Sequence, residues 1–345
     1  MRPAVSFGSA ATPARRTALG IVLAILLGLG WAVLYINALF APRALAGPVS
    51  LSIPTAASSR EVAGLLYRRG LIASPWVFDV YVRVRRVDES IKPGFYRFGT
   101  GLSLPRLTDT LVAGPPSILV TIPGGLTVDQ IASYLAARGL VDKAHFLRDA
   151  ADERFNYGFL KGVPAGPGRL EGFLYPDSYL VADGPNQSDT IINMMLRRFE
   201  QEEVKLDYAP KAKAEGLTVR QAVTVASIVE REAQKNDQRA EVAGVIMNRL
   251  KLNMPIQSDA TVRYALGTHA ADLPPGAFKV ASPYNTYLHA GLPPGPIASA
   301  GEASLLASVQ PARTSDLYFL AKPDGTLVFS STLAGQNANS NRYLK

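Results

Sequence analysis

Glu230 is the residue of this chain whose surroundings most suggest acid–base chemistry, and it lies in the stretch ASIVEREA, Ala226 to Ala233. The stretch has a helical pattern. At about 100° per residue, Glu230 projects between Val219 and Val223, inside an apolar stripe. A carboxylate buried without a partner is costly, so it either pairs with a cation or keeps its proton. A carboxyl group that keeps its proton at ordinary pH is what a general acid requires. Glu230 is therefore a candidate proton donor.

The helix that would position Glu230 has a clear predicted start, because Thr218 is followed three residues later by Gln221, which forms a capping box. Its apolar face is expected to hold Val219, Ala222, Val223, Ala226, Val229 and Ala233. Its solvent face is expected to hold Arg220, Thr224, Ser227, Arg231, Gln234 and Lys235. Glu232 falls at the edge of the apolar stripe. The alternative to a catalytic Glu230 is a buried ion pair with an arginine such as Arg249 or Arg263.

Polar and aromatic residues follow this helix in short motifs that could bind sugar rings and acetamido groups. The candidate substrate-binding residues are Asn248, Gln257, Ser258, Asp259, Tyr284, Asn285, Thr286 and Tyr287. Each has a plainer alternative: tyrosines often serve as packing, and Ser258 and Asp259 could cap a helix at Thr261 to Leu266. The prolines of GLPPGPI, Gly291 to Ile297, predict a rigid loop.

Several other chemistries are not favoured. The chain has no cysteine, which excludes a thiol nucleophile and Cys-ligated zinc. Its three histidines, His145, His269 and His289, lack metal-ligand spacing, so no metal and no cofactor is expected. A glycoside hydrolase would need a second carboxyl group beside the first. The candidates for that second group are Glu171, Asp177, Asp237 and Asp259.

An apolar segment precedes all of these motifs. Ala18 to Phe40 is uncharged over 23 residues, which at about 1.5 Å per residue is long enough to cross a bilayer of about 30 Å. Residues 1–43 hold four arginines and no acid, half of the net charge of +8, so the rest of the chain is only weakly basic and nucleic-acid binding is not favoured. We expect a cytoplasmic tail at 1–16 and a membrane helix at 17–41, with the remainder outside. The alternative is a signal peptide cleaved near Ala44-Leu45-Ala46.

An internal repeat follows the apolar segment. Val49 to Ile72 and Ile118 to Val141 share an alternating strand pattern, a Pro-led turn and a helix ended by glycine. Another strand is expected at Gly94 to Phe98, and Tyr81 to Arg86 is expected to form a solvent-exposed edge strand. A strand followed by a helix is expected within Leu102 to Gly114. We therefore expect small β-α units over 44–155. These units resemble LysM-type modules, and they would either bind glycan or space the next domain from the membrane.

The ordered motifs ASIVEREA, VIMNRL, QSDATVRYALG, SPYNTYLHAGLPPGPI and LYFLAKPDGTLVFS resemble the YceG-like family of endolytic murein transglycosylases, and RLEGFLYPDSY resembles the start of its catalytic region. Ala260 stands where family members often carry proline. The resemblance implies an α+β catalytic domain over 156–345, with Glu230 in the place of the family's catalytic glutamate. Within that domain, the turn residues Pro323-Asp324-Gly325 between two apolar runs predict a hairpin.

The resemblance further implies a lytic transglycosylase of the cell wall. Such an enzyme cleaves the bond between N-acetylmuramic acid and N-acetylglucosamine, leaves 1,6-anhydro ends and ends strand elongation. It would be held in the inner membrane by residues 17–41, with its catalytic domain in the periplasm, where it acts on peptidoglycan strands beside their synthases. The alternatives are a membrane-tethered glycan-binding scaffold and a two-carboxylate muramidase.

Overall fold

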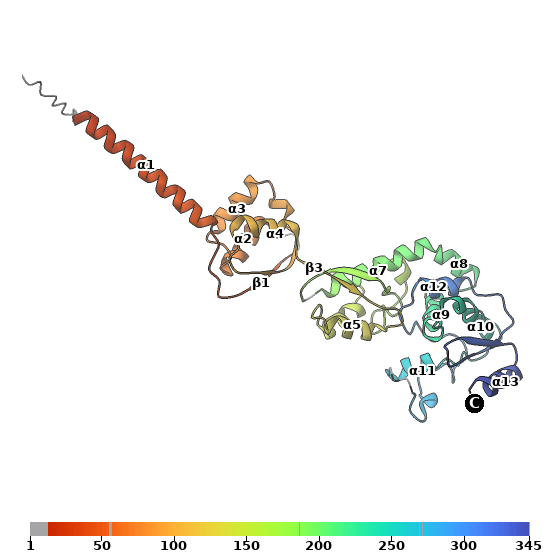
Figure 1. Cartoon of the computed structure of the whole chain (residues 1–345). Helices are drawn as coiled ribbons and strands as arrows, with labels where there is room; N and C mark the ends of the chain where they lie inside the picture. The colour runs from red at the N-terminus through yellow and green to blue at the C-terminus, as the bar shows by residue number, and fades with distance from the viewer. Residues whose placement is uncertain (1–12, 55–56, 186, 269, 271, 345) are drawn as a thin grey trace, which may run out of the picture. The chain divides into compact units, whose positions relative to one another are not determined.

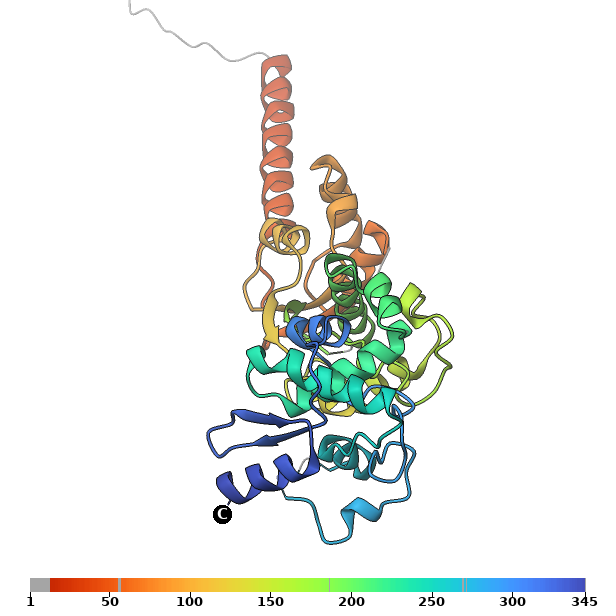
Figure 2. The same cartoon turned by 90° about the vertical axis from the view of Figure 1, so that its right-hand side faces the viewer.

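The structure is a computed structural model that describes residues 13–54, 57–185, 187–268, 270 and 272–344. It is a mixture of helices and short strands, as the α+β class predicts. The chain divides into two compact units, Met1–Ser117 and Ile118–Lys345 (Figures 1 and 2). Residues 1–12 of the expected cytoplasmic tail lie outside the described residues, as does His269.

The apolar segment forms one long helix, α1, Pro13–Phe40. Within it, Ile21–Phe40 is long and apolar enough to cross a membrane, and none of that span is buried in the protein. Its last residue, Phe40, contacts the folded remainder of the first unit. The ring of Phe40 meets that of Tyr81 edge-on, with 5.3 Å between ring centroids.

The rest of the first unit is a two-stranded antiparallel sheet covered by helices. Its elements are β1 Val49–Ile53, α2 Ser59–Arg68, α3 Pro75–Val84, the 3-10 turn Asp88–Ser90, β2 Gly94–Phe98 and α4 Leu104–Ala113. Leu51 lies opposite Tyr96 in the sheet. Both are buried with Leu66 of α2 and Phe78 of α3, so the unit has its own core.

Two expectations for this unit need correction. Tyr81 to Arg86 is not a strand edge, because α3 runs through its first four residues. Ser74 caps α3, Pro75 opens it, and the buried Phe78 and Val82 lie four residues apart, which is a helical spacing. The stretch Leu102 to Gly114 contains the expected helix, α4, but no strand.

The second unit holds the candidate chemistry. Its strands are β3 Ser117–Thr121, β4 Ser178–Ala182, β5 Tyr318–Ala321 and β6 Leu327–Ser330. Its helices are α5 Val128–Ala136, α6 Lys143–Ala151, α7 Ser188–Lys205, α8 Tyr208–Ala214, α9 Val219–Glu232, α10 Arg239–Lys251, α11 Asp259–Leu266, α12 Glu302–Val309 and α13 Leu333–Tyr343, with 3-10 turns at Gly158–Leu160, Asn236–Gln238 and Ala277–Lys279. The hairpin expected around Pro323-Asp324-Gly325 is confirmed as β5 and β6.

The internal repeat occurs as the element order β-α-α-β in each unit. In the second copy β3 pairs with β4, and α5 contacts α6 between them. Ile131 and Leu135 of α5 share one core with Phe199 of α7 and Ala226 of α9. The second repeat copy therefore belongs to the second compact unit, which begins at residue 118. The sequence analysis expected this copy in the repeat region and the catalytic domain to begin at residue 156.

Helix α9 lies at the centre of the second unit, in contact with α8, α10, α11 and α12. The capping box of Thr218 and Gln221 is confirmed. Thr224 and Ser227, expected on a solvent face, are instead buried. The reason is that the segment before α12 covers that face, and the Ile297 amide donates to Ser227 Oγ at 3.0 Å.

Candidate active site

Two carboxyl groups lie at the C-terminal end of α9, on different sides of it. Glu230 and Glu232 are two residues apart, which separates their directions by about 200° on a helix. They therefore have different neighbours, and their chemistry differs accordingly.

Glu230 points inward as predicted, and its side chain is only 12% exposed. It forms an ion pair with Arg239, the first residue of α10, and accepts the Gly301 amide at 3.2 Å. A Cβ atom at Gly124 would lie 2.6 Å from Glu230 Oε1, so a larger residue there would have to displace the Glu230 carboxyl group. The ion pair lines a cavity of about 670 Å³. Glu230 is thus held by a guanidinium group at the wall of a cavity.

Arg249, one of the arginines expected as an alternative partner of Glu230, bonds to other groups. Arg249 donates instead to three backbone oxygens, including those of Leu317 at 2.6 Å and Ile256 at 2.7 Å. Arg239 was not singled out in the sequence, because no pattern indicates that the start of α10 turns back toward the end of α9.

Glu232 has the surroundings of a proton donor. Ser258 Oγ donates to Glu232 Oε1 at 2.5 Å, and the side chain keeps partial exposure to solvent. Burial raises the pKa of Glu232, and the negative charge of Asp259 adds to this. The Ser258 hydroxyl, the Ala260 amide and the positive charge of Arg263 oppose the shift in pKa without cancelling it.

Four of the eight predicted substrate-binding residues gather beside Glu232. Ser258 contacts it directly, and the Ser258 amide donates to Thr286 Oγ1 at 3.0 Å. The Tyr287 hydroxyl donates to Asp259 Oδ1 at 2.6 Å. The QSDAT and SPYNTY motifs therefore meet at one place, and that place is at Glu232 rather than at Glu230.

Two of the other predicted residues hold loops together. Asn285 is fully buried, and its amide donates to the Phe278 and Val280 carbonyls, each at 3.0 Å. Asn248 donates to the Thr314 carbonyl at 2.8 Å, away from both glutamates.

The last two lie in the same region but bond to other neighbours. Gln257 accepts from Arg249 at 3.3 Å and has a left-handed backbone, with φ of 54°. The ring of Tyr284 packs on that of Tyr264 of α11, with 4.8 Å between centroids. Gln257 precedes Ser258, which contacts Glu232, whereas Tyr284 packs on Tyr264, whose hydroxyl donates to Glu171.

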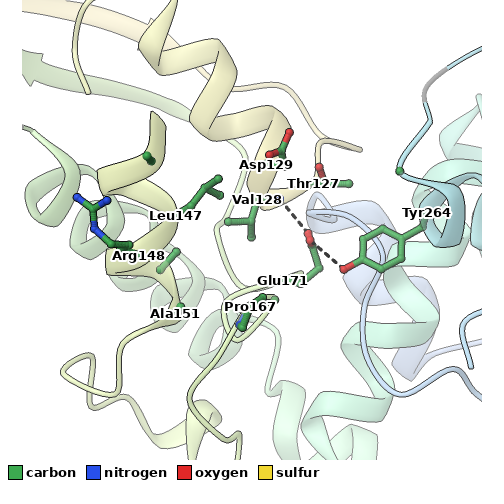
Figure 3. A pocket seen from close by; sticks show the side chains of 13 residues that line it. Thr127, Val128, Asp129, Leu147, Arg148, Ala151, Pro167, Glu171 and Tyr264 are labelled. Atoms are coloured by element: carbon green, nitrogen blue, oxygen red, sulfur yellow. Dashed lines mark hydrogen bonds between the residues drawn. The ribbon is translucent and has the colours of Figure 1, made fainter. Parts of the chain in front are cut away.

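A second cavity, of about 840 Å³, lies between α5, α6 and α11. Figure 3 shows Glu171 in its wall, between Val128 of α5 and Tyr264 of α11. Glu171 accepts the Val128 amide at 3.1 Å and the Tyr264 hydroxyl at 3.3 Å, and it is only 4% exposed. Burial raises the pKa of Glu171 to about 8. This carboxyl group therefore holds its proton at neutral pH.

The raised pKa of Glu171 predicts that stability falls as pH rises. Between about pH 4.5 and about pH 8 the folded chain holds a proton that the unfolded chain releases. Linkage then lowers the free energy of unfolding by at most about 1.4 kcal/mol per pH unit across that window. Glu171→Gln should flatten this part of the curve in denaturant titrations at several pH values.

The matched control for that titration is Glu241→Gln, at an exposed position of α10, which should keep the wild-type slope. If Glu171→Gln and Glu241→Gln had the same pH dependence as the wild type, the proton on Glu171 in the folded state would be refuted.

The remaining candidates for a second carboxyl group, Asp177, Asp237 and Asp259, lie in different parts of the second unit. Asp177 pairs with Arg198 at 2.6 Å and lines the cavity of Glu230, while Asp237 is exposed in a 3-10 turn. Asp259 alone among the four lies beside Glu232. Within the described part of the chain, no group of three or more histidine, cysteine or acidic side chains could hold a metal ion.

Comparisons with known proteins agree with these motifs. The sequence pattern that defines the YceG-like family matches residues 51–342. The chain is 32% identical over 308 residues to the endolytic murein transglycosylase of Bacillus subtilis, which covers 86% of this chain and 85% of that protein. It is 29% identical over 302 residues to the protein of the same name from Streptococcus pneumoniae, and spans 54% of that longer chain. A crystal structure of a yceG-like protein from Listeria monocytogenes superposes with a TM-score of 0.57 at 30% identity, covering 85% of this chain and 99% of the other.

Proposed function

This chain belongs to the YceG-like family, and we propose that it is a lytic transglycosylase that cleaves peptidoglycan glycan strands at internal bonds. Two observations support the proposal. Relatives from Bacillus subtilis and Streptococcus pneumoniae bear the name endolytic murein transglycosylase. The chain also holds a carboxyl group with a raised pKa, Glu232, where two motifs of polar and aromatic residues meet.

We propose Glu232 for the proton-transfer role, as an alternative to Glu230, the residue expected from the sequence. The first step of glycosidic cleavage needs a protonated acid at the leaving oxygen. Glu232 meets this need because burial and the charge of Asp259 favour its neutral form. Glu230, by contrast, is in an ion pair with Arg239. The position of Glu232 beside Ser258 and Asp259 is the observation that carries the assignment.

The reaction requires only one carboxyl group. Glu232 gives its proton to the glycosidic oxygen between N-acetylmuramic acid and N-acetylglucosamine, and the bond from that oxygen to the muramyl C1 breaks. The muramyl C6 hydroxyl then bonds to C1, and its proton passes to the Glu232 carboxylate. The product is a 1,6-anhydro end, no water is consumed, and the acid is restored. An intramolecular nucleophile brings the benefit of proximity.

The neighbours of Glu232 support that cycle. Ser258 orients the carboxyl group through its hydroxyl, and Tyr287 orients Asp259 in the same way. Tyr284 and Tyr264 offer aromatic surface to sugar rings on the side toward Glu171. Asn248, Asn285 and Gln257 support the loops, and Thr286 joins the two motifs.

We place the enzyme at the cytoplasmic membrane. Helix α1 would cross the membrane once, with Arg15 and Arg16 before its apolar span on the cytoplasmic side, so that the chain after α1 lies outside. The β-α-α-β unit of the first half would act as a LysM-like glycan binder or as a spacer. In this location the enzyme meets nascent strands beside peptidoglycan synthases, and cleavage there would end strand elongation.

The mass of the products tests the proposal. Glycan strands digested by the full chain in detergent should yield internal fragments with anhydro ends, each lighter by one water than a hydrolysis product. Fragments without that loss of mass would indicate a muramidase with a second carboxyl group. Strands that remain whole while binding the protein would indicate a scaffold.

Asp259 should tune the pH range of the reaction. Because the charge of Asp259 raises the pKa of Glu232, Asp259→Asn should lower that pKa and move the alkaline limb of the kcat profile to lower pH. A displacement of one pH unit would correspond to about 1.4 kcal/mol. The asparagine can still accept the Tyr287 hydroxyl. Rates measured over a pH series give the position of the limb.

Tyr287→Phe is the control, since it keeps the Asp259 charge and removes only the hydroxyl. Its alkaline limb should remain close to that of the wild type. An unmoved limb in Asp259→Asn would argue that Glu232 is not the acid whose titration the profile reports.

A further inference from the structure

The outward side of α3 in the first unit carries three exposed apolar side chains. Trp76, Val80 and Val84 are 72%, 39% and 77% exposed. Their spacing of four residues places them along one side of the helix, over about 12 Å. The opposite side is buried through Phe78 and Val82. A large aromatic residue and two β-branched residues in one exposed row need a partner, and we call this row the α3 stripe.

The end of α1 fixes where the α3 stripe lies along the membrane normal. Phe40 is the last residue of α1, and its ring contacts that of Tyr81 in α3. Both Phe40 and Leu45 pack against the core of the first unit. Tyr81 follows Val80 directly, so its side chain lies about 100° around α3 from the stripe. A bilayer crossed by α1 would therefore end at the level of α3.

The charges around the stripe suit an anionic lipid surface. Residues 57–87 contain six arginines and only two acids, Glu61 and Asp79. Arg83 pairs with Asp79 and Arg85 pairs with Asp109, while Arg86 forms no ion pair among the residues that the structure describes. Apolar residues with tryptophan on one side of a helix, flanked by basic residues, are typical of helices that lie in the membrane interface.

We propose that α3 lies on the outer surface of the membrane that α1 crosses, with the α3 stripe inserted among the headgroups of anionic phospholipids. The proposal rests on the membrane anchor proposed above and is independent of the glycan chemistry. It gives the first unit a second attachment beside α1. That attachment would hold the unit against the membrane instead of letting it swing on the short connection between Phe40 and Val49.

The two tryptophans of the chain make this testable. Trp31 lies in α1 and Trp76 in the α3 stripe, so the full chain with Trp31→Phe reports on Trp76 alone. In phosphatidylglycerol vesicles brominated near the top of the acyl chains, Trp76 should lose most of its emission. Aqueous iodide should quench it little. Strong iodide quenching together with no bromine quenching would overturn the proposal.

Two variants make the result specific. Val80→Asp with Val84→Asp, in the Trp31→Phe chain, should restore iodide quenching of Trp76, because both sites are exposed and tolerate charge in the fold. In Trp76→Phe the remaining tryptophan is Trp31 in α1, and brominated lipid should quench its emission whether or not α3 docks. An absence of quenching of Trp31 would refute the membrane crossing by α1 rather than the docking of α3. If added glycan strands rather than lipid shielded Trp76, the stripe would be a glycan contact and the proposal would be wrong.

Discussion

Replacing Glu232 with glutamine should lower the turnover of glycan strands by about 10²–10⁴-fold, the range that a positioned proton donor supplies. The amide has no proton to give to the leaving oxygen, but it keeps the size of the side chain and can still accept the Ser258 hydroxyl. Binding of strands should therefore persist. Release of anhydro ends, followed by mass spectrometry under single-turnover conditions, measures the loss in the chemical step.

Glu230→Gln is the matched comparison, since it makes the same chemical change two residues away on the same helix. It removes the ion pair with Arg239, so it should cost stability while leaving most of the turnover at temperatures where the variant is folded. The opposite pattern, with full loss in Glu230→Gln and little in Glu232→Gln, would return the catalytic role to Glu230. Equal losses in correctly folded variants would mean that neither acts alone.

Replacing Arg239 with methionine should destabilise the second unit by about 3–5 kcal/mol, the cost of leaving one partner of a buried pair without its countercharge. Both side chains of the pair are about one-tenth exposed, so solvent screens the interaction little. The substitution also removes the donor to Ser304 on α12. The midpoint of denaturant unfolding, compared with that of the wild type, gives the loss.

The double variant Glu230→Gln with Arg239→Met separates the ion pair from simple loss of packing. Without a buried charge, it should recover part of the stability that Arg239→Met alone loses, so the two changes should not be additive. If the losses simply summed, the contact would contribute no coupling and Glu230 would be accessible enough to be solvated by water.

Some features of this protein follow from short stretches of sequence. The helix α1 follows from 23 uncharged residues, and the start of α9 follows from Thr218 and Gln221. The hairpin follows from its Pro-Asp-Gly turn between two apolar runs. Each depends on residues within one or two turns of chain, so local propensity and hydrophobic period are enough to predict it. The strand, turn and first helix of each repeat copy belong here too, because each copy carries its own pattern, whereas the second helix of each copy was not predicted.

Other features depend on which elements meet. The strand predicted at Tyr81 to Arg86 was wrong because its alternating apolar and basic residues fit a strand as well as a helix. Only the packing of the core around Phe78 selects the helix. The burial of Thr224 and Ser227 likewise depends on a segment about 70 residues later in the chain that covers α9.

The sequence by itself determined that a carboxyl-bearing helix follows a membrane-length apolar segment and is followed by motifs rich in polar and aromatic residues. Only the tertiary structure decided which carboxyl group those motifs reach. Ser258 comes to Glu232 across 26 residues of chain, and Arg239 comes to Glu230 because α10 turns back beside α9. Helical projection says which way a side chain points, but its charge state depends on the groups that the fold brings against it.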